Sequence, residues 1–301
     1  MKRFAQKAMI MQTAPQGGGS GGGGNNDDWV VGDGKTRLHI SIPTDYRTDL
    51  LLAINQTISR GVLVNWGDGS EIETSNRTGD VTFNHHYPKS GDYIIELDVA
   101  EGCELTLGSE SYSQSLLGGS DSNKETYCLL LKKAEIGSNV NTIGATAFQK
   151  CYNLSHISIS EGVTTFKNYA FDSCYHLSIA NVPRSISIND GLTFKYCRSL
   201  SQFHIADGVT TICKEMFSNC SSLTTINIPG SVTSIDYRAF FSCKFMKYYD
   251  FTDHTSIPAL SNSNAFNEIP SDCEIRVPAA LVDEWKAATN WSTYASQIVG
   301  V

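Results

Sequence analysis

From about residue 127 the hydrophobic positions of the chain return with a period of 23 residues. Each period holds a cysteine and a leucine or methionine three places after it; every period but the first has an aromatic residue three places before the cysteine, and every period but the last has apolar residues eight and twelve places after it. The cysteines are Cys128, Cys151, Cys174, Cys197, Cys220 and Cys243, and the aromatic residues are Phe148, Phe171, Phe194, Phe217 and Phe240. A fixed period of this length predicts a solenoid, in which each repeat buries an apolar face against the next one.

Within one repeat the pattern predicts a short helical turn followed by a short strand. Phe148 and Cys151 are three residues apart and therefore share one face of a helical turn. Leu154, Ile157 and Ile159 end in the period of two that is typical of a strand. Strands of successive repeats would pair in a parallel ladder at a spacing of about 4.8 Å. We therefore expect the cysteines and the phenylalanines to form two columns in the core.

The repeats resemble the BspA-like leucine-rich repeats, which read roughly I-x-x-I-G-x-x-A-F-x-x-C-x-x-L-x-x-I-x-I-P-x-x-V. Ile143-Gly144, Ala147-Phe148, Cys151 and Leu154 fit this pattern in one repeat. The resemblance covers about residues 127–301, and it implies a leucine-rich-repeat solenoid and, ordinarily, a bacterial surface adhesin. Residues 178–193 depart from the pattern, so we expect an irregular backbone there.

The C-terminal residues are expected to close the end of the solenoid. Phe266 lies 26 residues after Phe240, so three residues are inserted in that turn. Pro278 precedes an amphipathic pattern over residues 279–289, which predicts a helix. Trp285 and Trp291 are expected in the core of this cap rather than on its surface as a stacking platform.

Between residues 29 and 107 the hydrophobic period changes to two. Residues 37–42, 50–54 and 62–66 each read as a short strand, and Asp68-Gly69 is a strong signal for a tight turn. Several short strands separated by turn signals predict a small β-sandwich.

Two motifs in this segment resemble the polycystic-kidney-disease (PKD) domain family. The first is Trp66-Gly67-Asp68-Gly69-Ser70, and the second consists of His85, Tyr87, Gly91 and Tyr93. The resemblance implies an immunoglobulin-like sandwich that serves as a spacer or adhesion module without catalysis. His85 is then a motif residue, and we expect no metal at the His85-His86 pair because no third ligand stands at a recognisable spacing.

The predicted fold class is mainly β, with a small PKD- or immunoglobulin-like β-sandwich, a solenoid of about six turns and a C-terminal capping helix. The predicted divisions are an N-terminal peptide (1–16), a glycine-rich linker (17–28), the sandwich (29–108), a junction (109–126), the solenoid (127–265) and the cap (266–301).

The N-terminal peptide carries three basic residues and no acidic one, so its net charge is opposite in sign to the −8 of the whole chain. Its candidate anchoring residues are Lys2, Arg3, Phe4, Lys7, Ile10 and Met11. The peptide fits a short amphipathic peg that binds a particle protein, and a disordered tail fits equally well. The glycine-rich residues that follow suit a flexible tether, although a remnant of an expression tag is an alternative.

Charge and cysteine usage exclude several classes of protein. A pI of about 5.3 argues against a general nucleic-acid binder, and the chain has no apolar run long enough to span a membrane. Six of the nine cysteines belong to the repeat column, which predicts reduced thiols packed in the core rather than disulfides or a metal site. We expect no cofactor.

The candidate binding surface is the outward side of the predicted repeat strands. Its residues are His156, Ser158, Asn181, Gln202, His204, Thr225, Asn227, Tyr248 and Asp250. Hydroxyl, amide, imidazole and aromatic groups suit a host-surface glycan or protein, and they lack the density of positive charge that phosphate requires. An ordinary solvated sheet face is the alternative interpretation.

We find no catalytic constellation in the sequence, which favours a binding or structural protein over an enzyme. Two settings remain open. One is a virion-displayed adhesion or decoration protein held by residues 1–16, because no export signal is recognisable and a basic peptide is followed by a tether. The other is a bacterial cell-surface adhesin, as the repeat resemblance implies. Oligomer formation is compatible with either setting.

Overall fold

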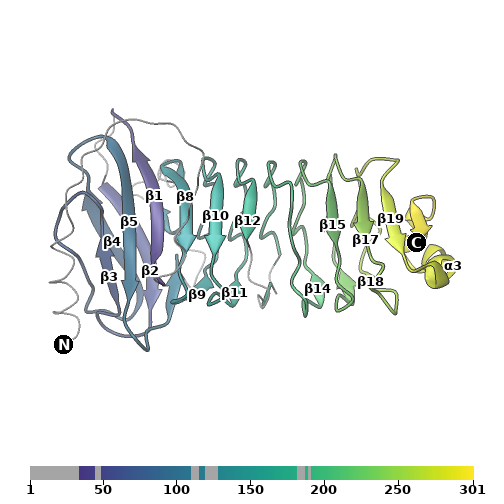
Figure 1. The fold of residues 1–301 in the computed structure, drawn as a ribbon, viewed down its shortest axis with the longest axis horizontal. Helices are drawn as coiled ribbons and strands as arrows, with labels where there is room; N and C mark the ends of the chain where they lie inside the picture. Colours follow the sequence, from purple (N-terminus) through teal and green to yellow (C-terminus); the bar gives the residue numbers. More distant parts are fainter. Residues whose placement is uncertain (1–33, 45–48, 110–114, 119–127, 182–186, 189–190) are drawn as a thin grey trace. The chain divides into compact units, whose positions relative to one another are not determined.

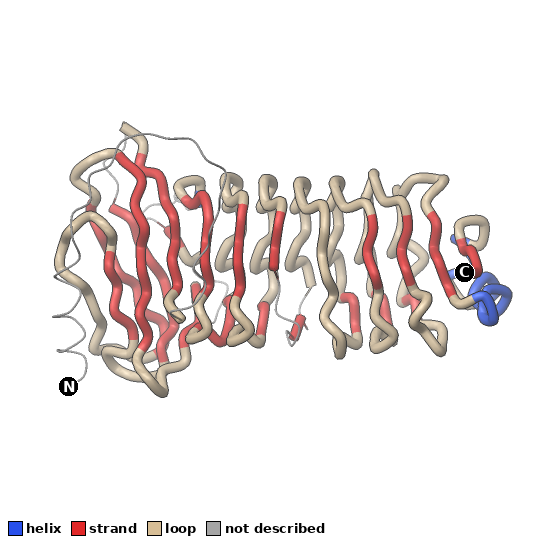
Figure 2. Tube along the Cα trace, in the orientation of Figure 1, coloured by secondary structure: helices blue, strands red, loops and turns tan. Residues whose placement is uncertain are grey.

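The structure is a computed structural model that describes residues 34–44, 49–109, 115–118, 128–181, 187–188 and 191–301. The described part is mainly β and contains a β-solenoid of about seven turns, with a single short α-helix near the C-terminus (Figures 1 and 2). The predicted fold class is therefore confirmed in its mainly β solenoid and its C-terminal helix. The candidate anchoring residues of the N-terminal peptide lie outside the described residues.

The segment before the solenoid forms two groups of antiparallel strands. One group is β1 (Thr36–Ile42), β5 (Gly91–Val99) and β3 (Val62–Asn65), and the other is β2 (Asp49–Gln56), β4 (Gly79–His86), β6 (Leu105–Leu107) and β7 (Leu117–Gly118). In β1 every second side chain is buried, as the alternation of Leu38, Ile40 and Ile42 predicts. These side chains and those of β2 belong to one hydrophobic core.

Both groups of strands continue into the solenoid by backbone pairing. The first repeat strand, β8 (Leu131–Ile136), pairs antiparallel with β1, and β9 (Val140–Ile143) pairs parallel with β6. Leu116 and Leu117, from the predicted junction, are buried, and β7 pairs with β2. The N-terminal strands therefore supply hydrogen-bonding partners to the first turn of the solenoid and leave no open strand edge there.

Two rows of short parallel strands form the solenoid (Figure 1). One row consists of β8, β10 (His156–Ile159) and β12 (Ile179–Asn181), and, after an interruption, β15 (Thr225–Asn227), β17 (Tyr248–Asp250), β19 (Glu274–Val277) and β20 (Ile298–Gly300). The other row consists of β9, β11 (Thr165–Phe166) and β13 (Ser187–Ile188), followed by β14 (Thr211–Ile212), β16 (Ser234–Ile235) and β18 (Ala259–Leu260). Strand β17 pairs with β19 in parallel. The parallel ladder therefore extends into residues 266–301, which the sequence predicts as the cap.

The predicted phenylalanine column is present as a stack of parallel rings. The successive centroid distances are 5.2 Å for Phe148–Phe171, 5.3 Å for Phe171–Phe194, 5.9 Å for Phe194–Phe217, 5.4 Å for Phe217–Phe240 and 5.3 Å for Phe240–Phe266. Interplanar angles of 4° to 9° make the column nearly regular. Because Phe266 continues the column after the three-residue insertion, the solenoid has about seven turns rather than six.

The helical turn predicted around each phenylalanine is replaced by a series of hydrogen-bonded turns with strained left-handed residues. The residues two before and two after the ring have positive φ, and they are Thr146 and Lys150, Tyr169 and Ser173, Leu192 and Tyr196, Glu215 and Asn219, and Arg238 and Ser242. This backbone points the phenylalanine N–H toward the next turn, as in the bond from Phe217 N to Ala239 O of 2.8 Å. The repeated hydrogen bond offsets a left-handed strain of about 1–2 kcal/mol per residue.

The C-terminal cap contains the predicted tryptophan core but a shorter helix than expected. The helix predicted over residues 279–289 is a 3₁₀ turn (Ala279–Leu281) followed by α3 (Val282–Ala287). It ends early because Ala288 is extended and Asn290 has a φ of 66°. Trp285 and Trp291 are buried and contact each other at a centroid distance of 5.5 Å, which confirms their place in the core.

Candidate functional site

The predicted binding residues lie at matched positions of the outward strand row. Backbone pairing sets His156 beside Ile179 and Ser158 beside Asn181. Further along the row it sets Thr225 beside Tyr248 and Asn227 beside Asp250. His156, Ser158, Thr225, Tyr248 and Asp250 are half-buried and Asn227 is exposed, while the residues between them face the core.

The row is interrupted at one turn. Gln202 and His204 are exposed, as predicted, but they belong to no strand, so the outward sheet ends at β12 and resumes at β15. Phe203 lies between them and packs edge-on against Phe194 and Phe217, the pair with the widest ring spacing in the column. The predicted site is therefore divided into a part before this turn and a part after it.

A charged network that the sequence did not reveal occupies the N-terminal end of the same sheet. Arg37 on β1 lies 3.2 Å from Glu96 on β5 and 3.6 Å from Glu135 on β8. His39 lies 3.3 Å from Glu135, and Lys35 pairs with Glu96. The basic side chains of β1 thus pair with the acidic side chain of β8, the first repeat strand. Opposite charges on neighbouring strands stabilise the pairing of β1 with β8. Arg37 and Glu135 are about a hundred residues apart, and nothing in their spacing predicts the contact.

The C-terminal end of the row carries charged residues that sequence reasoning also missed. β19 adds Glu274 beside Tyr248 and Arg276 beside Asp250. The Arg276 guanidinium lies 3.8 Å from the centre of the Tyr248 ring and 2.7 Å from Glu274. A guanidinium over an aromatic face is a stabilising arrangement that fixes both side chains. A cleft of about 510 Å³ adjoins them, lined in part by Lys244, Phe245 and Lys247.

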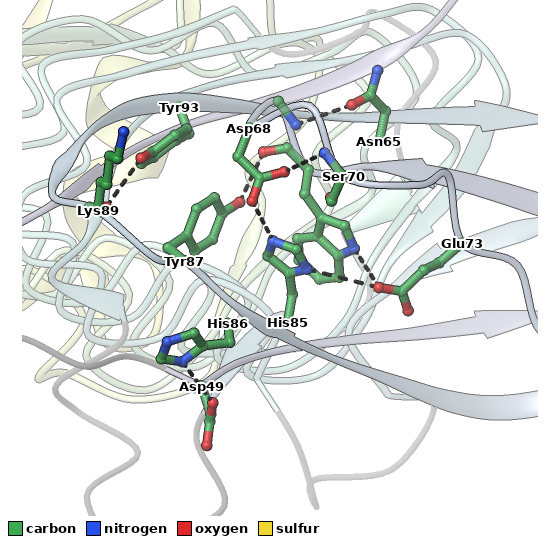
Figure 3. A network of polar contacts seen from close by, with 12 residues as sticks. Asp49, Asn65, Asp68, Ser70, Glu73, His85, His86, Tyr87, Lys89 and Tyr93 are labelled. Carbon is green, nitrogen blue, oxygen red and sulfur yellow. Dashed lines mark hydrogen bonds and ion pairs between the residues drawn. The ribbon is translucent and has the colours of Figure 1, made fainter.

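The motif residues near His85 form a closed structural cluster rather than a ligand site (Figure 3). His85 Nε2 lies 2.9 Å from Asp68 Oδ2, and the imidazole stacks on Trp66 at a centroid distance of 4.5 Å. Trp66 Nε1 donates to Glu73 at 2.8 Å, and Tyr87 donates its hydroxyl hydrogen to Trp66 O at 2.9 Å. The cluster thus joins the turn after β3 to the end of β4.

The turn itself explains two further motif positions. Gly67 has a φ of 79°, and a Cβ atom there would lie 2.5 Å from Ile94 O, so only glycine fits. The Asp68 carboxylate accepts a hydrogen bond from Ser70 N at 3.0 Å. Burial opposes ionisation of Asp68, but the hydrogen bonds from Ser70 and His85 outweigh it and lower the pKa of the carboxyl. Asp68 is therefore a charged anchor for the buried imidazole.

The column cysteines are buried in the core as free thiols, which confirms the predicted packing role. The thiols of Cys174, Cys197, Cys220 and Cys243 each donate to the carbonyl of the phenylalanine 26 residues earlier, at 3.1 to 3.3 Å. Burial raises the pKa of Cys220 well above its usual value, and it raises that of Cys243 to about 12. Neutral, hydrogen-bonded thiols of this kind are poor nucleophiles and poor metal ligands.

Within the residues that the structure describes, no three His, Cys, Asp or Glu side chains gather as a metal site would require. In the same described ranges, no helix has the length and hydrophobicity needed to cross a bilayer.

Comparison with known families identifies the repeats. Residues 123–247 match the family described as "BspA type Leucine rich repeat region", in six copies. They form a BspA-type leucine-rich repeat region. The predicted resemblance is thus confirmed for this part of the chain, and that of residues 29–107 to the PKD family stays a prediction.

Three solved leucine-rich repeat proteins are similar. A leucine-rich repeat protein of T. pallidum is 20% identical, with a TM-score of 0.46 over 56% of this chain and 83% of that one. A leucine rich cell surface protein of Faecalibacterium prausnitzii is 30% identical, with a TM-score of 0.41 over 49% of this chain and 39% of that one. A leucine-rich repeat protein of Bacteroides ovatus is 21% identical, with a TM-score of 0.37 over 50% of each chain. No curated protein sequence matches the chain.

Proposed function

We propose that this protein is a non-enzymatic recognition protein that binds a glycan or protein on another surface through the outward strand row of its leucine-rich repeats. The observation that carries the proposal is the register of that row. Polar and aromatic side chains occupy outward positions in both parts of the row, namely His156 and Ser158 on β10 and Thr225, Asn227, Tyr248 and Asp250 on β15 and β17.

The rigidity of the repeats supports recognition rather than catalysis. The side chains of the row stand on strands that are paired to neighbours and backed by the phenylalanine and cysteine columns. Such a scaffold holds its outward groups at a fixed spacing of about 4.8 Å, so little conformational entropy is lost on binding. The most nucleophilic residue type of the repeats, cysteine, is buried and engaged by backbone carbonyls.

The setting of the protein is a second part of the proposal. BspA-type repeats favour display on a bacterial cell surface, whereas the basic N-terminal peptide and the glycine-rich tether favour attachment to a virion. In both settings residues 1–16 hold the chain and a PKD-like segment separates the anchor from the repeats. Fractionation of the native source separates the two, because a virion protein co-purifies with particles and a cell-surface protein is released from intact cells by protease.

Binding of fluorescently labelled full-length chain to mucin-coated beads, epithelial cells and intact bacterial cells tests the recognition function. We expect saturable binding to at least one of these surfaces. Replacing His156, His204, Asn227 and Tyr248 together by alanine should weaken it at least about tenfold, because several contacts are lost at once.

The matched control changes exposed residues at the other end of the strands. Glu161 and Asp207 are exposed side chains in turns, and their replacement by alanine should leave binding unchanged. Equal binding by the wild type and by the variant with four alanine substitutions would show that the outward row is not the recognition surface.

A further inference from the structure

The cleft beside β17 and β19 has a composition that differs from the rest of the solenoid. It has a volume of about 510 Å³, and its lining includes Lys244, Phe245, Lys247, Tyr248, Asp272 and Arg276. Tyr248 is the one residue of this group that also belongs to the predicted outward row. A cavity of this size accommodates one or two sugar units.

The cleft exists because the leucine column of the repeat ends at this place. Leu154, Leu177, Leu200, Leu223 and Met246 are all buried at one position of the repeat. In the next turn the same position falls on Asp272, which is exposed. Met246 is among the residues that line the cleft between the two turns.

The residues around this space break the repeat pattern in a concerted way. Two places after the cysteine the four preceding turns carry the polar residues Asn153, His176, Ser199 and Ser222, and four places after it they carry Ser155, Ser178, Ser201 and Thr224. Cys243, the last cysteine of the column, is followed at these positions by Phe245 and Lys247. The Phe245 side chain is 66% exposed, so it does not pack in the core as the column phenylalanines do.

The charges of the cleft are opposite in sign to those of the chain as a whole. Lys244, Lys247 and Arg276 line it together with Asp272 and Glu274, a net charge of +1 in a protein of net charge −8. Arg276 is held by Glu274 at 2.7 Å and by the Tyr248 ring. Lys244 and Lys247 are both exposed, and the two residues flank Phe245 in the sequence.

We propose that this cleft binds a carboxylated sugar, such as a uronic or sialic acid unit of an acidic glycan. This assignment rests on the proposed recognition function and names the ligand class of one part of its surface. The lysines supply charge-assisted hydrogen bonds to the carboxylate, and Phe245 supplies an apolar face for the sugar ring. Asp272 accepts hydrogen bonds from sugar hydroxyls.

A peptide fits this cleft less well than a sugar. One common way for a peptide to bind beside a sheet is to add a strand to an open edge. β17 already pairs with β15 and β19, and β19 pairs with β17 and β20, so neither strand has a free edge. A compact ligand with a carboxylate, hydroxyls and a C–H face matches the side chains without needing backbone pairing.

Calorimetric titration of the full chain tests the proposal with defined probes. The probes are tri-galacturonate, 3′-sialyllactose, the methyl ester of tri-galacturonate and a hexapeptide with a free C-terminal carboxylate. We expect both acidic sugars to bind, the acid at least about tenfold more tightly than its ester, and binding to weaken as salt is raised.

Substitutions that restore the residue types of the other turns locate the site. Lys244→Ser with Lys247→Ser should weaken tri-galacturonate binding at least about tenfold, and Phe245→Asn at least about threefold. Lys132→Ser, an exposed lysine at the same repeat position in the first turn, should leave it unchanged. Circular dichroism of each variant establishes that it is folded.

The outcomes distinguish this assignment from the recognition function itself. Equal affinity for the acid and its ester, tighter binding of the hexapeptide, or full binding by the lysine variant overturns the acidic-sugar assignment. If the labelled chain still binds its surface in the cell and bead assay, only this assignment has failed. If the unmodified chain binds neither the acidic sugars in the titration nor any surface in the cell and bead assay, the recognition function is overturned as well.

Discussion

The phenylalanine column makes a quantitative prediction about stability. Phe217 is fully buried, stacks on Phe194 and Phe240 at 5.9 and 5.4 Å, and meets the edge of Phe203 at 4.9 Å. Replacement of a buried phenylalanine by alanine costs about 3–5 kcal/mol, which includes the cost of the cavity left behind. We expect the Phe217→Ala variant to fall near the upper end of this range.

The upper end is expected because the backbone around Phe217 has little freedom to collapse. Its N–H donates to Ala239 O at 2.8 Å, and its carbonyl accepts the Cys243 thiol at 3.3 Å. The cavity therefore persists, and three aromatic contacts worth about 0.5–1.5 kcal/mol each are lost with the ring. In a repeat protein this weakens the coupling between neighbouring turns, so the turns after residue 217 should exchange amide hydrogens faster than those before it.

Guanidinium unfolding followed by circular dichroism measures the loss, and Phe245→Ala is the matched control. Phe245 is the same residue type and lies two places after Cys243, but it is 66% exposed. Its replacement should change the free energy of unfolding by less than about 0.5 kcal/mol. Equal losses in the two variants, or a loss below about 1.5 kcal/mol for Phe217→Ala, would refute the role assigned to the column.

Three further predictions concern strain, thiols and the N-terminal cluster. Thr146→Gly should raise the free energy of unfolding by about 0.5–1 kcal/mol because it relieves a β-branched residue at a φ of 59°, whereas Thr164→Gly should lower it; chemical denaturation decides. The column thiols should react with a disulfide reagent at pH 8 only as the protein unfolds, and rapid reaction of the native chain would contradict their burial. Since burial raises the folded pKa of Cys151, Cys174, Cys197, Cys220 and Cys243, to about 12 for Cys243, the contribution of these thiols to stability is complete below their unfolded pKa and is lost as pH rises toward 12. Asp68 has a lowered pKa, so its contribution is present above the unfolded value of 3.8 and is lost on acidification; Asp68→Asn should flatten the acid side of the profile of Tm against pH, and an unchanged profile would contradict this.

The repeat architecture was predictable because the same residue types recur at one spacing from Cys128 to Cys243. The positions of Phe148, Cys151 and Leu154 recur often enough that their burial, and the register of the columns, follow from the sequence. The helical turn around each phenylalanine was predicted wrongly, since a separation of three residues does not distinguish a helix from alternating left- and right-handed backbone. The choice depends on hydrogen bonds to the next turn, which a single repeat does not contain.

The candidate site was predictable only in part. Outward positions such as Thr225 and Asn227 follow from strand periodicity once the core positions are known. The ion pairs of Arg37 with Glu96 and Glu135 depend on pairing between distant strands, and the sequence has no local signal for them. Phe245 and Lys247 did leave a signal, because they depart from the residue types at their repeat positions. Such departures from the repeated residue types coincide with the cleft.

The most direct test of the central claim is hydrogen–deuterium exchange of the full chain in the presence and absence of the surface that binds it best. If the outward row is the recognition surface, bound chain should show slower exchange at β10, β15, β17 and β19, with unchanged exchange at β14, β16 and β18 in the other row. Protection confined to β14, β16 and β18, or to the strands before residue 109, would contradict the account.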